Sequence, residues 1–343
     1  MTLPEGKEEA QCRKYGCQIR NNMGINLDKP YLWKADISQS VDFYNKWFMS
    51  FAPKTYRESR GMTASRVEDA IKQTRQLVEI TPETLRKHPE FLAILRMCTC
   101  PPLARDRLIG LSGVSKNLVM VMENSENPRI PSKLDEKELV AELQKICKII
   151  NEMIDQDIFD WLLKKRDPSL TELNRASAII ADRLCGSYSD PLIRNEQEKR
   201  QLGAISNFLE KRGYSLVDIN ESINEMKEKT FSFHKNVPAF ISGQDGKKIN
   251  ITVDVAVKRP ETSHNQFPLL IECKSAGDFT NVNKRRKEEA EKMHQLKNTY
   301  GQNVPYVLFL CGYFDAGYLG YEAAEGIDWI WEHRISDLDM LDL

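Results

Sequence analysis

The chain has 343 residues and a mass of 39.6 kDa, a length that predicts about two compact units. Hydrophobic residues make up 41% and charged residues 29% of it, which is ordinary for a globular protein and excludes a long low-complexity arm. The net charge of −1 excludes a protein that coats nucleic acid by bulk attraction, but it is compatible with a locally basic cleft.

The N-terminal segment MTLPEGKEEAQ lacks the basic and apolar pattern of a signal peptide. No apolar run approaches the roughly 20 residues that a membrane-spanning helix needs, so we expect a soluble, cytoplasmic protein without membrane contact. The eight cysteines are scattered, and Cys98 and Cys100 form a CxC without nearby paired ligands. This spacing favours buried thiols over a zinc site.

Residues 36–155 have the pattern of a helical domain. Apolar residues recur at three- and four-residue spacing in segments such as ASRVEDAIKQTRQLVEI and DEKELVAELQKICKIINEMI. Thr81, Pro82 and Glu83 supply a cap, a first-turn proline and an acid, which predicts a helix start. We therefore expect a mainly helical N-terminal domain over residues 1–165.

A second domain, over residues 166–343, has the pattern of a mixed α/β fold. Its start near Asp167 is rich in Gly, Ser and Pro, which suits a boundary. An amphipathic helix over 195–212 precedes a short strand at 214–217 and three β-rich runs, FSFHKNVPAFI, KINITVDVAVK and FPLLIECKS. A charged helix over 283–300, a strand over 304–312, a short helix and a strand over 327–335 follow. The order predicts a strand meander within a mixed sheet flanked by helices.

Two of the β-rich runs contain acidic residues within an otherwise apolar pattern. In ITVDVAVK, apolar residues alternate with polar ones, so we expect Asp254 to project from the face opposite Val253 and Val255. In PLLIECKS, Glu272 and Lys274 lie on one side because strand side chains repeat every two residues. Burying a carboxylate and an ammonium costs several kcal/mol each unless they are paired or bind a metal.

Carboxylates that converge from adjacent strands provide the oxygen ligands that Mg²⁺ prefers. We expect Asp254, Glu272 and the backbone carbonyl of Cys273 to hold the ion. Lys274 would orient or activate a water molecule and offset developing negative charge in phosphodiester hydrolysis. An ordinary exposed Glu-Lys pair beside an unrelated Asp is the alternative interpretation of the same triplet.

The ordered pattern resembles the PD-(D/E)xK nuclease superfamily over about residues 195–335. The acid Asp254 follows Val253, seventeen residues intervene, and Glu272-Cys273-Lys274 supplies the ExK, although the proline of the motif is missing. The resemblance implies a core of helix, three-strand meander, helix and strand. It also implies an auxiliary metal-binding glutamate on the first core helix, for which Glu198 is our choice and Glu196 its rival.

More narrowly, the chain resembles the XamI-like type II restriction endonucleases. The resemblance is carried by WFMSFAPKTYRESR, LRMCTCPPLARDRLIG, RNEQEKRQL, the two acidic strands and LFLCGYFDAGYLGYEAAEGIDWIWEHRI. It implies metal-dependent cleavage of double-stranded DNA at a short, palindromic sequence, with 5′-phosphate ends. It further implies a homodimer, since two-fold DNA symmetry matches a two-fold protein, and a cognate DNA methyltransferase as functional partner.

A DNA-cutting enzyme needs basic side chains on phosphates and base edges. Residues 51–120 hold 12 Lys and Arg against 7 Asp and Glu, so the helical domain has a DNA-contacting or dimerisation role in this interpretation. The candidates for DNA contact are Arg259, Lys284, Arg285, Arg105 and Arg107. For the cluster at 284–287 a self-paired, solvated helix is an equal alternative, because acids follow it directly.

Two other functions fit the same residues. A structure-specific or repair nuclease of the same fold would use the same metal chemistry, and a non-catalytic DNA-binding module would keep the fold alone. The intact set of Asp254, Glu272 and Lys274 argues against the second. No glycine-rich loop of the kind that cradles a nucleotide is present, which disfavours methyltransferase or ATP-dependent activity.

Overall fold

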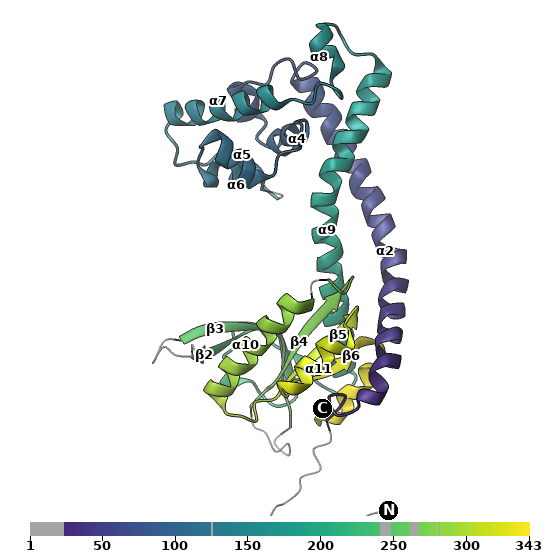
Figure 1. Ribbon diagram of the computed structural model, residues 1–343. Helices are drawn as coiled ribbons and strands as arrows, with labels where there is room; N and C mark the ends of the chain where they lie inside the picture. The colour runs from purple at the N-terminus through teal and green to yellow at the C-terminus, as the bar shows by residue number, and fades with distance from the viewer. Residues whose placement is uncertain (1–23, 125, 241–247, 261–266, 281) are drawn as a thin grey trace, which may run out of the picture. The chain divides into compact units, whose positions relative to one another are not determined.

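The computed structural model describes residues 24–124, 126–240, 248–260, 267–280 and 282–343 (Figure 1). The chain forms two compact units. Residues 48–196 make up one, here called the helical unit, and residues 1–47 and 197–343 make up the other, here called the sheet unit. The domain boundary expected near residue 165 therefore falls within the helical unit.

The N-terminal part of the chain is helical, as predicted. Its helices are α2 (Pro30–Gln73), α3 (Pro82–Lys87), α4 (Phe91–Met97), α5 (Arg105–Ser112), α6 (Lys116–Met122), α7 (Glu136–Met153), α8 (Asp160–Lys164) and α9 (Leu170–Glu210). The expected start of α3 is confirmed, because the Thr81 hydroxyl accepts the Thr84 N–H at 3.3 Å and Pro82 is the first helical residue. In the part of the chain that the structure describes, no helix has the length and apolar character that crossing a membrane requires.

Most of the Gly, Ser and Pro residues that follow Asp167 lie within α9, which runs unbroken through Gly186 and Pro191. The hydroxyls of Ser187 and Ser189 donate to the carbonyls of Leu184 and Cys185 at 2.6 and 3.0 Å. These residues thus satisfy their polar groups within the helix instead of forming a turn.

The sheet unit is built on six strands in sequence order. They are β1 (Ser215–Leu216), β2 (Thr230–Phe240), β3 (Lys248–Lys258), β4 (Leu269–Ala276), β5 (Tyr306–Gly312) and β6 (Asp328–Trp331). Strands β2, β3 and β4 form the predicted antiparallel meander, whereas β1 pairs parallel with β2, and β4, β5 and β6 pair parallel. The mixed sheet expected from the sequence is confirmed.

Helices cover both faces of this sheet. Helices α10 (Val282–Tyr300) and α11 (Ala316–Ala324) lie side by side against one face (Figure 1), where Met293 and Leu319 join Leu308 in a core. The C-terminal part of α9 covers the other face and packs Ile205 against Phe309. The core between these layers makes the sheet a rigid base for polar side chains at its strand ends.

The last strand is shorter than expected. The sequence predicts a strand over 327–335, but β6 ends at Trp331 and a 3-10 segment, η3 (Glu332–Leu341), follows; a second, η2, spans Ile223–Glu225. Glu332 forms a 2.9 Å ion pair with Arg200, and Arg334 bonds Asp36 at 2.6 Å. These buried polar pairs hold the chain in a conformation that a straight strand does not provide.

Candidate active site

The acids predicted from the sequence meet where β3 and β4 separate. The ladder between the two strands pairs Val257 with Leu269 and ends with Val255 opposite Ile271. The next residues along the strands are Asp254 and Glu272, so both carboxylates begin at the point where backbone pairing stops. Asp254 nevertheless stays tied to β4, because its Oδ2 accepts the Cys273 N–H at 2.7 Å.

The single apolar face expected for β3 is wrong. Ile251 and Val253 pack into the core beneath α10 and α11, whereas Val255 and Val257 pack into the core beneath α9. The alternation therefore changes face at Asp254. A strand that twists sharply at one residue turns that side chain out of the regular pleat.

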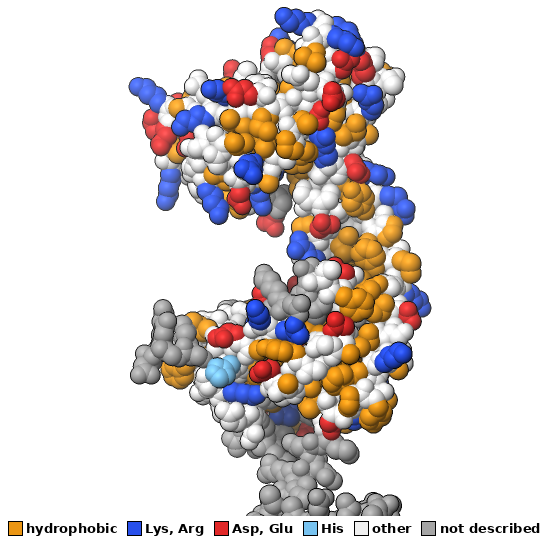
Figure 2. Space-filling view, viewed as in Figure 1, with side chains coloured by type: hydrophobic (Ala, Val, Ile, Leu, Met, Phe, Trp, Pro, Cys, Tyr) orange, Lys and Arg blue, Asp and Glu red, His pale blue; other side chains and the backbone are white. Residues whose placement is uncertain are grey.

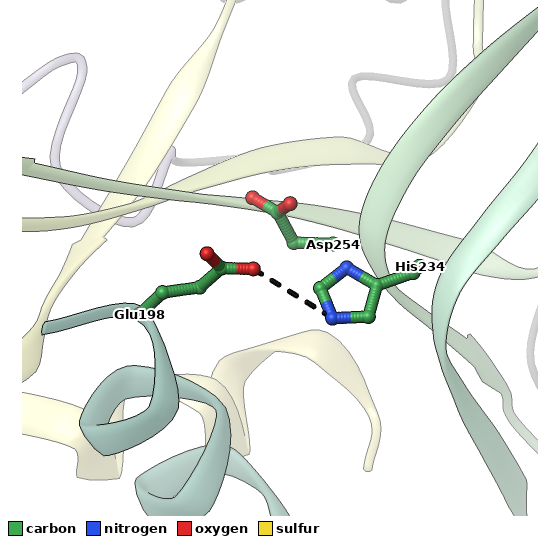
Figure 3. Close-up of side chains that lie close together, drawn as sticks. All are labelled: Glu198, His234 and Asp254. Atoms are coloured by element: carbon green, nitrogen blue, oxygen red, sulfur yellow. Dashed lines mark ion pairs between the residues drawn. The ribbon is translucent and has the colours of Figure 1, made fainter. Parts of the chain in front are cut away.

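The neighbouring strand is distorted at the same level. His234 in β2 has a φ of 50°, in the left-handed region, between the pairs that join Phe233 with Val255 and Lys235 with Val253. A non-glycine residue in this region costs free energy, and such residues cluster at functional sites. The distortion places the His234 ring beside Asp254 (Figure 3).

Glu198 reaches the same point from α9. Its Oε1 lies 3.6 Å from Nε2 of His234, and potential ligand atoms of Glu198, His234 and Asp254 all lie within 4.8 Å of one another (Figure 3). Glu196, its rival for the auxiliary role, is not part of this group. Glu198 and His234 are about half exposed, with side-chain exposures of 48% and 45%, so the group is open to solvent.

Glu272 is a buried acid at the fork, at 3% exposure. Its Oε1 accepts from Nζ of Lys274 at 2.9 Å and from Nζ of Lys292, on α10, at 2.5 Å. Among the described residues its Oε2 has no hydrogen-bond partner, although this atom is buried as well. A buried carboxylate oxygen without a partner is costly, and a cation is one group that satisfies it.

Lys274 is held between two carboxylates. Its Nζ lies 2.9 Å from Glu272 and 3.5 Å from Glu289, a fully buried residue of α10. Burial lowers the pKa of Lys274, but the charges of Glu272 and Glu289 outweigh it and raise the pKa to about 12. Lys274 is therefore an ammonium ion near neutral pH and not a free base.

The pKa of Asp254 is raised to about 6. Burial is the main cause and the charge of Glu272 the second, while the Cys273 N–H, Lys274 and Lys292 act in the opposite direction. Two acids that repel one another in a partly buried site are an arrangement that a divalent cation stabilises.

The residues expected to contact DNA lie in different environments. Arg259 is half-buried and donates to the Leu341 carbonyl at 3.1 Å, and burial lowers its pKa. Arg105 and Arg107 are exposed on α5, with Arg105 4.0 Å from Glu123. Lys284 and Arg285 lie in the first turn of α10, and their side chains lie outside the described residues.

Sequence reasoning missed three residues at the fork: His234, Glu289 and Lys292. The sequence contains a signal for Glu289, because it lies at helical spacing from the buried residues Met293 and Leu296. A carboxylate on such an apolar helix face is costly to bury unless it pairs with a cation or a hydrogen-bond donor. Lys292 lies one turn further along α10. His234 has no comparable signal, because the backbone distortion that positions it is not encoded by strand periodicity.

Comparison with known proteins identifies the family of this chain. The sequence profile of the XamI restriction endonuclease family matches residues 75–331. The chain is also 48% identical over 318 residues to the type II restriction enzyme SalI of Streptomyces albus G, covering 92% of this chain and 98% of that protein. No solved structure matches it.

Proposed function

Because the chain belongs to the XamI restriction endonuclease family and is a type II site-specific deoxyribonuclease acting on double-stranded DNA, we propose that Asp254, Glu272 and Lys274 carry its catalysis. The observation that supports this assignment most directly is the meeting of both acids and the ammonium at the β3–β4 fork. In this proposal the enzyme hydrolyses the phosphodiester bond and leaves 5′-phosphate ends.

The donor set fits a divalent cation, and we propose Mg²⁺. Glu272 offers a buried oxygen without a partner among the described residues, and Asp254 offers a carboxylate that burial and charge repulsion destabilise. The Cys273 carbonyl and, more weakly, Glu198 would complete an oxygen set of the kind that Mg²⁺ prefers. His234 suits transition metals better, so we place it as a partner of Glu198. When bound, the ion would polarise the scissile phosphate and lower the pKa of a water molecule.

The protein's own groups divide the remaining work. As an ammonium, Lys274 donates hydrogen bonds and offsets the negative charge that develops on phosphate oxygens. Glu289 and Glu272 fix its position from two sides, and such preorganisation lowers the cost of reaching the transition state. The Asp254 carboxylate is fixed by the Cys273 N–H.

This assignment predicts metal-dependent, sequence-specific fragments. Purified protein incubated with unmethylated phage DNA and Mg²⁺ should give discrete bands, and EDTA should abolish them. The fragments should religate directly with DNA ligase, and phosphatase treatment should prevent religation, because the ends carry 5′-phosphates. Identical bands in EDTA would contradict the metal site, and ends that need a kinase before ligation would contradict the cleavage chemistry.

The same digest tests the symmetry of the cleaved site. We propose a homodimer acting on a palindromic site, because a two-fold protein readily matches two-fold DNA. Palindromic ends religate with one another in any combination, whereas asymmetric ends do not. We also propose a cognate DNA methyltransferase, because an unmodified host genome would otherwise be cut. The proposed location of the enzyme is the cytoplasm.

We propose that the helical unit contacts the DNA backbone. A groove of about 700 Å³ lies between α2 and α9, and its walls carry Arg57, Arg60 and Arg183. Arg183 is held by Asp155 at 3.0 Å, whereas Arg57 is exposed and Arg60, 3.5 Å from Asp182, is 50% exposed. Figure 2 shows lysine and arginine side chains over the visible face of this unit, interspersed with acids. Arg105 and Arg107 extend the set of phosphate-binding candidates.

Replacing Arg57 and Arg60 together with alanine is expected to weaken binding to specific and non-specific duplexes alike. Each lost phosphate contact should lower the slope of log affinity against log salt concentration by about one. Arg75→Ala is the control, since this exposed arginine of the same unit pairs with Glu79 at 2.7 Å. An unchanged salt slope in the double variant, measured by fluorescence anisotropy, would remove the groove from the DNA interface.

A further inference from the structure

Two lysines share one oxygen of Glu272. Lys274 and Lys292 place their Nζ atoms 2.9 and 2.5 Å from the same Oε1. Lys274 lies two residues from Glu272 on the same strand, but Lys292 reaches it from α10. Two ammonium groups on one oxygen repel each other, so their shared position must be stabilised by the surrounding acids.

Lys274 and Lys292 differ in how they are held. Lys274 also contacts the buried carboxylate of Glu289 at 3.5 Å. Lys292 has Glu272 as its only carboxylate partner among the described residues, and its other contact is a 3.4 Å hydrogen bond to the Thr252 carbonyl. Its side chain is 28% exposed. Lys292 can thus move away from Glu272 without breaking a contact to a second carboxylate.

Lys292 also bridges the two strands that carry the proposed metal ligands. It spans from Glu272 in β4 to Thr252 in β3, and Thr252 lies two residues from Asp254. One ammonium therefore contacts both strands that carry the acids we assign to the metal.

We propose that Lys292 is an internal counter-ion of Glu272, a positioning residue that competes with the divalent cation for this carboxylate. This inference rests on the proposed metal site at Asp254 and Glu272. Lys292 holds the Glu272 carboxylate in position before the metal binds, and it weakens metal binding while it stays there. DNA phosphates, which attract a partly exposed ammonium, would draw Lys292 away and make metal binding stronger on DNA than off it.

The test is a Mn²⁺ titration followed by electron paramagnetic resonance of the free ion, first without DNA. Lys292→Met removes the charge and keeps the aliphatic stem. We expect it to bind Mn²⁺ about tenfold more tightly than the wild type, because a nearby like charge and a competitor for Glu272 are both lost. Lys292→Arg retains the charge and should restore the weaker affinity. Lys287→Met, an exposed lysine of the same helix, controls for the change in net charge.

Cleavage kinetics provide a second measurement of the effect of Lys292 on metal binding. Lys292→Met should reach half of its maximal single-turnover rate at a lower Mg²⁺ concentration, and adding a duplex should tighten its Mn²⁺ binding less than that of the wild type. A residue with a merely structural role would not shift the metal dependence in this direction. If Lys292→Met does not fold, Lys292→Gln serves the same purpose.

The outcomes separate the two proposals. If wild-type protein binds Mn²⁺ and Asp254→Asn abolishes that binding, the metal site stands. An affinity of Lys292→Met equal to or weaker than that of the wild type would then overturn the role of Lys292 alone. If no Mn²⁺ binding depends on Asp254, both proposals are wrong.

Discussion

Replacing Asp254 with asparagine is expected to lower the rate of DNA cleavage roughly 10³-fold, the scale seen when one preorganised electrostatic group is lost from an active site. Asparagine keeps the shape of the side chain and an oxygen that accepts the Cys273 N–H, which Asp254 binds at 2.7 Å. It removes the charge that a metal ligand needs. Single-turnover cleavage of a duplex with one site is the measurement.

This substitution should not lower the stability of the folded protein. Burial and the charge of Glu272 raise the pKa of Asp254 to about 6, so its ionised form is destabilised in the folded protein. A neutral asparagine relieves that repulsion, and we expect the urea midpoint of Asp254→Asn to equal or exceed that of the wild type. Asp157→Asn, at an exposed position of the helical unit, is the control. Wild-type cleavage by Asp254→Asn would exclude Asp254 from the reaction.

The fork could be predicted in part because Glu272 and Lys274 lie two residues apart on the same strand. Period-two alternation placed Glu272 and Lys274 on one side of β4, and the meander brought Asp254 beside them. The helix and strand order of the sheet unit followed from apolar patterns and glycines that end helices, as at Gly213 and Gly301, both with positive φ. Local sequence patterns predict a helix or strand correctly where one side-chain period holds over its whole length.

Predictions failed where one residue departs from that period. The face of β3 changes at Asp254 and the backbone of β2 distorts at His234, and each departure belongs to the site. Glu289 and Lys292 depend on which side of α10 meets the sheet, a property of tertiary packing that the charged helix pattern hides. The continuity of α9 through Pro191 has another origin, since helical packing on both sides overrides a single proline.

Stability should fall as pH rises because of Glu322, a fully buried residue of α11. Burial raises its pKa to about 8, the charge of Glu289 adds to this, and Arg286 opposes it. Below pH 4.5 the carboxyl is protonated in both states. Between pH 4.5 and 8 the unfolded chain loses the proton and the folded chain keeps it, so the free energy of unfolding decreases with pH. Above pH 8 the loss is complete.

Glu322→Gln removes this titration, so its stability relative to wild type should grow from pH 5 to pH 8 by roughly 3–5 kcal/mol, the scale of a pKa raised by a few units. Urea unfolding of both proteins at several pH values measures the difference, with Glu325→Gln, an exposed acid next to the end of the same helix, as the control. Parallel stability curves for wild type and Glu322→Gln would show that Glu322 ionises normally. A rising difference would instead mean that Glu322 is neutral at pH 7, so that it adds no second buried negative charge beside Glu289.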